Sequence, residues 1–128
     1  WLFGDVKKNI VHAHSHDRAA GFLEFENAEA EWFLSINSDT ISQNKLDEGH
    51  TRNRSLLFNG EEVNFTSGFE DLHTESYKEI LRGNGIRSHQ MYDTIKLLHE
   101  IRHSEPQELK WNYHPLAELP QSIHPFKS

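Results

Sequence analysis

The sequence predicts an α+β fold: a predominantly antiparallel sheet that carries helices packed on one face and offers its other face for subunit contact. Three observations predict this class. Apolar and polar residues alternate over residues 28–37, as in a half-buried strand. An Asn59-Gly60 pair between two short apolar runs is typical of a tight hairpin. Two later segments, which follow Ser67 and Ser88, repeat apolar residues with the period of a helix.

The first half of the chain is expected to form three strands. Residues 8–16 are extended, and residues 18–26 follow them after a break at His16-Asp17. A two-residue turn at Glu26-Asn27 leads into residues 28–37.

This turn sets the register of the second and third strands. Leu23 should lie opposite Ala30, and Gly21 opposite Trp32, where the missing side chain of Gly21 leaves room for the indole. The face predicted to be buried consists of Ala28, Ala30, Trp32, Leu34 and Ile36.

The opposite face combines acidic and aromatic residues, namely Phe22, Glu24, Glu29, Glu31 and Phe33. Glu24 lies opposite Glu29 in this register, and directly opposed like charges destabilise a sheet. Such a face is either solvated or meets a partner surface that supplies Arg or Lys. We expect it to be the contact face of a homo-oligomer, with both Phe rings exposed in the single chain.

The remaining elements follow from turn and cap signals. Residues 38–53 are polar and are expected to form a long loop before the hairpin. Ser67 and Glu70 form a predicted capping box for the first helix, which Gly83 ends. Ser88 is expected to cap the second helix, which ends by Pro106. The predicted domain therefore covers residues 1–106, and a tail over residues 107–128 either lies across the sheet or is partly disordered.

Charge and composition exclude several classes of protein. With 13 basic and 20 acidic residues the net charge is −7, which disfavours nucleic-acid binding. No apolar run approaches the roughly 20 residues needed to span a bilayer. The absence of cysteine fits a cytoplasmic origin. Because the chain starts at Trp1 and its one methionine is Met91, we expect it to be a piece of a longer protein.

The histidines and glycines do not make a self-contained active site. His12, His14 and His16 would share one face of a straight strand, about 7 Å apart. No partner stands at a diagnostic metal-ligand spacing, so a polar strand face or a subunit contact explains the row more simply. Gly83-Asn84-Gly85 follows a predicted helix and lacks the third glycine of a dinucleotide loop. We therefore expect no metal, no catalytic residue and no cofactor site in this chain.

Four stretches together carry a resemblance to a known family. They are Trp1-Leu2-Phe3-Gly4-Asp5, then Gly21-Phe22-Leu23-Glu24-Phe25-Glu26 with Ala28 and Trp32-Phe33-Leu34-Ser35, then Asp71-Leu72-His73-Thr74-Glu75-Ser76-Tyr77, and Ile95-Lys96-Leu97-Leu98-His99-Glu100-Ile101-Arg102. In this order they resemble the C-terminal part of the Gfo/Idh/MocA oxidoreductases. The resemblance runs to about Arg102, with a weaker echo in Tyr113-His114-Pro115.

The resemblance implies a two-domain enzyme. In this family a Rossmann domain binds NAD or NADP, and the C-terminal domain lines the substrate site and mediates oligomerisation. The family's catalytic Lys and His would both precede Trp1, so this chain is expected to be inactive alone. The members it resembles most oxidise the 3-hydroxyl of a UDP-linked N-acetylated aminouronic acid in surface-polysaccharide (lipopolysaccharide) biosynthesis.

Four residues are candidates for contact with such a substrate. Arg54 could pair with a carboxylate or pyrophosphate through its bidentate donors, and His73, Glu75 and Tyr77 lie in the family-like helix motif. A surface ion pair for Arg54 and helix packing or capping for the other three are the simpler explanations. Two other functions stay open, because a fold does not determine function. The chain could be a stand-alone sugar-binding or oligomerisation module, or it could be a sugar isomerase or transporter-associated regulator.

Overall fold

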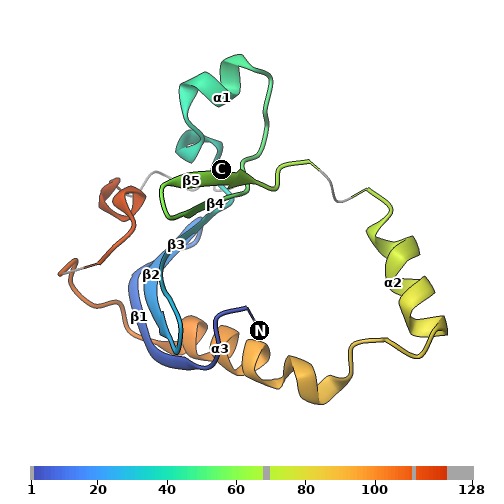
Figure 1. The fold of residues 1–128 in the computed structure, drawn as a ribbon. Helices are drawn as coiled ribbons and strands as arrows, with labels where there is room; N and C mark the ends of the chain where they lie inside the picture. Colours follow the sequence, from blue (N-terminus) through green and yellow to red (C-terminus); the bar gives the residue numbers. More distant parts are fainter. Residues whose placement is uncertain (1, 68–69, 111, 121–128) are drawn as a thin grey trace. The chain divides into compact units, whose positions relative to one another are not determined.

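The computed structural model describes residues 2–67, 70–110 and 112–120. The chain divides into two compact units, Trp1–Thr40 with Leu97–Ser128, and Ile41–Lys96. Figure 1 follows the chain through both units from blue to red. Strands pair antiparallel in both units and helices follow them in sequence, so the predicted α+β class is confirmed.

The first unit is built on a three-stranded antiparallel sheet in the order β1-β2-β3. Its strands are β1 (Val6–His14), β2 (Arg18–Phe25) and β3 (Glu29–Ser35). Leu23 pairs with Ala30 and Gly21 with Trp32, so the predicted register is confirmed. The Phe25 amide donates to the Ala28 carbonyl at 2.8 Å and closes the two-residue turn at Glu26-Asn27.

The core of the first unit is small and centred on β2. Among the described residues the buried apolar side chains are Val11, Ala20, Phe22 and Leu23. The prediction of a buried face formed by Ala28, Ala30, Trp32, Leu34 and Ile36 is wrong: the first three are half-buried, and Leu34 and Ile36 are 62% and 65% exposed. Within the described residues β3 has a neighbouring strand on one side only, so its end lacks the cover that β2 receives from both sides.

The second unit contains the predicted hairpin, β4 (Ser55–Phe58) and β5 (Glu61–Asn64). Asn59 and Gly60 have φ values of 50° and 85°, as a type I′ turn requires. The preceding residues 38–53 are not one long loop. They contain a 3₁₀ turn, η1 (Ser38–Thr40), and a short helix, α1 (Gln43–Asp47), because Ser42 starts a turn whose backbone bonds continue into the helix.

The next helix is α2 (Leu72–Leu81), and its start differs from the prediction. Its N-cap is Asp71, whose left-handed φ of 60° ends the helical path at that residue, so Ser67 does not cap α2. Gly68 and Phe69, which belong to the predicted capping box, lie outside the described residues. The predicted stop at Gly83 is confirmed. Gly83 has a φ of 84°, and its amide donates a hydrogen bond to the Ile80 carbonyl.

A 3₁₀ turn, η2 (Ser88–Met91), precedes α3 (Tyr92–His103). Ser88 is the first residue of η2 and not a cap. The Gln90 side chain caps the turn instead, because its Oε1 accepts the Arg87 amide at 2.8 Å. The helix ends at His103, before Pro106 as predicted. Packing of the helices on one face of the sheet stays a prediction, since α2 belongs to the second unit.

The described part of the tail lies on the sheet of the first unit, which agrees with one of the two predicted alternatives. The Gln107 amide donates to the Val11 carbonyl at 2.8 Å, and a last 3₁₀ turn, η3 (Pro115–Glu118), contacts β2. Trp111 and residues 121–128 lie outside the described part of the chain. None of the helices described here is both long enough and apolar enough to cross a bilayer.

Candidate functional site

The row of alternating histidines is broken by a bulge in β1. The register with β2 shifts between Val11 and Ala13, so His12 leaves the straight alternation. His12 is 7% exposed, whereas His14 and His16 are exposed. The expectation that all three share one strand face is therefore wrong, because it assumed a straight strand.

His12 is buried, and neither ring nitrogen has a hydrogen-bond partner among the described residues. Its ring meets that of Tyr113 edge-on, with centroids 6.2 Å apart. Across the described ranges, no group of three His, Cys, Asp or Glu side chains is placed to hold a metal ion.

A buried polar cluster ties the β1–β2 turn to the end of β3. Asp17 accepts hydrogen bonds from Ser15 Oγ at 2.7 Å and from Asn37 Nδ2 at 3.0 Å. The Asp17 carbonyl also accepts the Ile36 amide at 2.9 Å. Because Asp17 and Asn37 are both buried, these bonds satisfy polar atoms that water does not reach. The cluster stabilises the sheet by joining the β1–β2 turn to the residues that follow β3.

Arg18 connects this cluster to the tail. It is buried beside Asp17, with Nε 3.9 Å from Asp17 Oδ1, and its Nη2 donates to the Pro120 carbonyl. A buried guanidinium therefore holds the last described residue of the tail.

The acidic and aromatic face predicted for β2 and β3 is present, but it is partly covered. Glu24 lies directly opposite Glu29, as predicted. Phe22 is only 6% exposed and Phe33 is half-buried, so the expectation of exposed rings is wrong. For Phe33 the reason is the tail, because the His114 ring stacks on it with centroids 5.4 Å apart.

His114 is the most chemically distinctive residue on this face. Its Nδ1 accepts the Leu116 amide at 3.2 Å and so caps η3. Burial lowers the pKa of His114 from its ordinary 6.5, although the nearby Glu31 carboxylate acts in the opposite direction. The neutral imidazole is the form that this position favours.

The four substrate-contact candidates all lie in the second unit. Arg54 precedes β4, and its amide donates to Thr66 Oγ1 at 3.1 Å. On α2, His73 and Tyr77 stand one turn apart on one side, whereas Glu75 faces away from them. Glu75 pairs with Lys78 at 2.7 Å. Helical geometry thus brings His73 and Tyr77 together and separates Glu75 from them.

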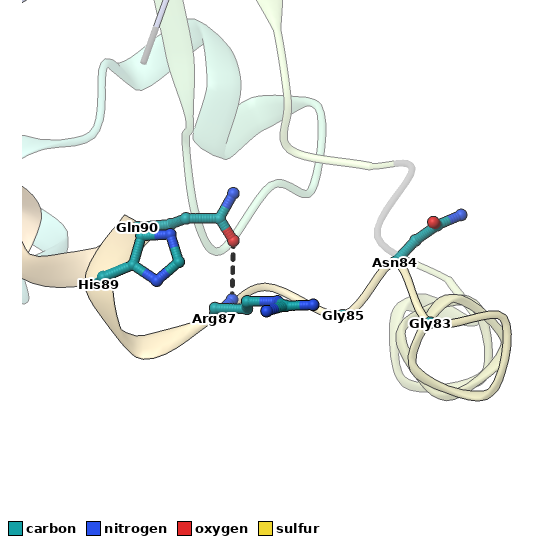
Figure 2. Close-up of a pocket in the computed structure, with 6 residues that line it drawn as sticks. All are labelled: Gly83, Asn84, Gly85, Arg87, His89 and Gln90. Carbon is teal, nitrogen blue, oxygen red and sulfur yellow. Dashed lines mark hydrogen bonds between the residues drawn. The ribbon is translucent and has the colours of Figure 1, made fainter.

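The second unit also has an open pocket of about 450 Å³ between α2 and η2, shown in Figure 2. It is lined by Gly83, Asn84, Gly85, Arg87, His89 and Gln90. The one bond drawn among these residues joins the Arg87 amide to Gln90 Oε1. The pocket is lined by the segment that ends α2 and by the 3₁₀ turn that follows it. A dinucleotide site has a strand-to-helix turn instead.

Among the solved structures that match this chain, two are of one enzyme. The WlbA (WbpB) dehydrogenase from Thermus thermophilus in complex with NAD and UDP-GlcNAcA matches with a TM-score of 0.85 and 35% identity. The same dehydrogenase in complex with NAD and alpha-ketoglutarate matches with a TM-score of 0.86 and 36% identity. Each match covers 91% of this chain. The chain is similar to WlbA dehydrogenase.

The similarity to WlbA concerns part of that enzyme, since the chain spans 38% of the length of each matched structure. No family model matches the sequence. The fold of the described residues is thus similar to that of a segment of the WlbA dehydrogenase.

The sequence reasoning missed His114 and Arg18 as the residues that hold the tail. His114 appeared only within the weak echo of the family motif. The pattern His114-Pro115 could have revealed its role, because a polar side chain followed by proline is typical of the start of a helical turn. Arg18 gave no such signal, since its partner is 102 positions away in the sequence.

Proposed function

We propose that this chain is the C-terminal substrate-and-assembly domain of an NAD- or NADP-dependent nucleotide-sugar dehydrogenase of the Gfo/Idh/MocA family. The observation that carries the proposal is the 35–36% identity with WlbA dehydrogenase at a TM-score of 0.85–0.86, over 91% of the chain. Identity at this level over a common fold supports a shared chemistry more strongly than fold alone does.

The proposed reaction is oxidation of the 3-hydroxyl of a UDP-linked N-acetylated aminouronic acid in surface-polysaccharide synthesis, in the cytoplasm. The cofactor would be held by a Rossmann domain outside this chain, which we propose as its partner. The described glycines do not fit a dinucleotide: Gly83 ends α2, and no strand leads into Gly85 within the described residues. The catalytic Lys and His are both proposed to lie outside this chain, the Lys in that Rossmann domain.

The surface of the second unit supports the proposal that this chain needs further protein around it. Every described residue of β4 and β5 is exposed, including Leu57 and Phe58. A two-stranded hairpin is at best marginally stable in water by itself. Cover from the rest of a larger enzyme, or from other subunits of a homo-oligomer, would remove this apolar surface from water.

Within that enzyme, Arg54 is our candidate for the carboxylate or pyrophosphate of the substrate. His73 and Tyr77 share one side of α2 and could meet the sugar together, and Glu75 would do so only from the other side. These assignments are proposals for the whole protein, and the chain by itself is not expected to turn over substrate.

The test is the reading frame that contains this chain. Its complete product should reduce NAD or NADP when given UDP-GlcNAcA, and it should leave UDP-GlcNAc, which lacks the carboxylate, largely unoxidised. Arg54→Ala should raise KM with a smaller effect on kcat, whereas Arg52→Ala, a nearby exposed control, should not. A reading frame that encodes no dinucleotide-binding domain would contradict the proposal and favour a stand-alone sugar-binding or oligomerisation module.

A further inference from the structure

Residues 112–120, called the tail strap below, contact β2 and β3 at three points. Asn112 Nδ2 donates to Glu29 Oε2 at 3.3 Å. The His114 ring stacks on Phe33 with an interplanar angle of 22°. At the far end, Arg18 donates to the Pro120 carbonyl. The strap therefore runs over β2 and β3 and covers Phe33.

The second of these contacts, at His114, depends on an unprotonated imidazole. His114 Nδ1 is the acceptor for the Leu116 amide, and Pro115 starts the turn between them. An imidazolium has two N–H donors and no acceptor, so protonation at Nδ1 removes this cap. It also places a charge on a half-buried ring stacked against a phenyl group.

The charged and titratable groups around the strap differ in what they do. Glu29 accepts from Asn112, Glu118 accepts from Tyr113, and Arg18 is committed to Pro120. Glu24 lies across from Lys8 on β1, and His12 meets Tyr113. Glu31 is the carboxylate whose charge acts on His114, and its effect on the pKa of His114 is smaller than that of burial.

We propose that His114 is a proton-sensitive latch: it holds the tail strap on the β2–β3 face while neutral and releases it on protonation, uncovering Phe33. A released imidazole has the ordinary pKa of 6.5, and burial lowers the pKa of the latched one. The latched state is thus fully favoured above the released pKa and is lost as pH falls through the lower latched pKa. One proton limits the change to about tenfold in the released population per pH unit.

The chain has no cysteine, which allows a single nitroxide to be placed at Leu119→Cys, an exposed position on the strap. Paramagnetic broadening of the Glu31, Trp32 and Phe33 amide signals reports whether the strap is on the sheet. We expect strong broadening at about pH 7.5 and its loss towards about pH 5. The loss should share its midpoint with the titration of the His114 ring, followed by NMR in the unlabelled chain.

Three variants separate the latch from other causes of pH dependence. His114→Asn retains an oxygen that can cap η3 but does not titrate, so its broadening should not change with pH. His12→Phe, a matched control in contact with the same strap, should keep the response of the parent chain. Glu31→Gln should move the midpoint to lower pH, because it removes the charge that favours the imidazolium.

Two results would overturn the proposal. One is broadening that does not depend on pH in the parent chain, or that changes at a pH where the His114 ring does not titrate. The other is a response that persists in His114→Asn or disappears in His12→Phe.

Discussion

The indole of Trp32 lies over the α-carbon of Gly21 on the neighbouring strand. A Cβ added to Gly21 would lie 2.7 Å from Trp32 Cζ2 and 2.2 Å from the Ile10 carbonyl oxygen. Both distances are shorter than van der Waals contact, and the second involves backbone that cannot rotate away. The close approach of three strands at this point therefore depends on a missing side chain.

Gly21→Ala is expected to lower the free energy of unfolding by about 3 kcal/mol, because the sheet must open to admit the methyl group. Urea unfolding followed by circular dichroism measures the change. Adding Trp32→Leu should not restore stability, since the Ile10 carbonyl remains in place. Ala30→Ser, which enlarges a half-buried side chain of the same sheet, should cost less than about 0.5 kcal/mol. Equal effects of the two substitutions would contradict the argument.

Asp17→Ala is expected to lower the free energy of unfolding by about 2–4 kcal/mol. The substitution removes the carboxylate that accepts from the buried Asn37 amide and from the half-buried Ser15 hydroxyl, and that lies next to Arg18. The matched control is Asp39→Ala, an exposed acid of η1, which should change the stability by less than about 0.5 kcal/mol. Asp17→Asn, which keeps one acceptor oxygen, should fall between them.

The 128-residue chain should not bind NADH, since the proposed function assigns the cofactor to a Rossmann domain outside this chain. Titration followed by nicotinamide fluorescence checks this expectation, with the complete dehydrogenase as the positive control. Saturable binding in the micromolar range would show that the described fold contains a dinucleotide site after all.

Self-association through the β2–β3 face should increase when the tail strap is removed. A chain that ends at Lys110 uncovers Phe33, and full burial of a Phe side chain is worth roughly 1.5–3 kcal/mol. Sedimentation velocity should show it associating at lower concentration than the full chain.

Phe33→Arg in the shortened chain should restore the monomer, whereas Phe58→Arg, on the separate β4–β5 hairpin, should not. Association that is unchanged by Phe33→Arg would exclude this face as the contact.

The elements that the sequence predicted well are those set by neighbours in the chain. The Asn59-Gly60 turn requires two positive φ values, which these residues adopt at little cost, so the hairpin could be read locally. The two-residue turn at Glu26-Asn27 likewise fixed the pairing of Gly21 with Trp32. Helix starts were predicted less accurately. Asp71, and not Ser67, is the N-cap of α2, and the side chain of Gln90, and not that of Ser88, accepts the hydrogen bond at the start of η2.

The amino-acid sequence by itself determined the α+β class, the β2–β3 register and the two helix periods, because each depends on the spacing of residues along the chain. Only the tertiary structure decided that a bulge takes His12 out of line with His14, that Arg18 reaches Pro120, and that His114 covers Phe33. These contacts join residues up to 102 positions apart. Such pairs leave no periodic trace in the sequence, since their distance depends on how the whole unit packs.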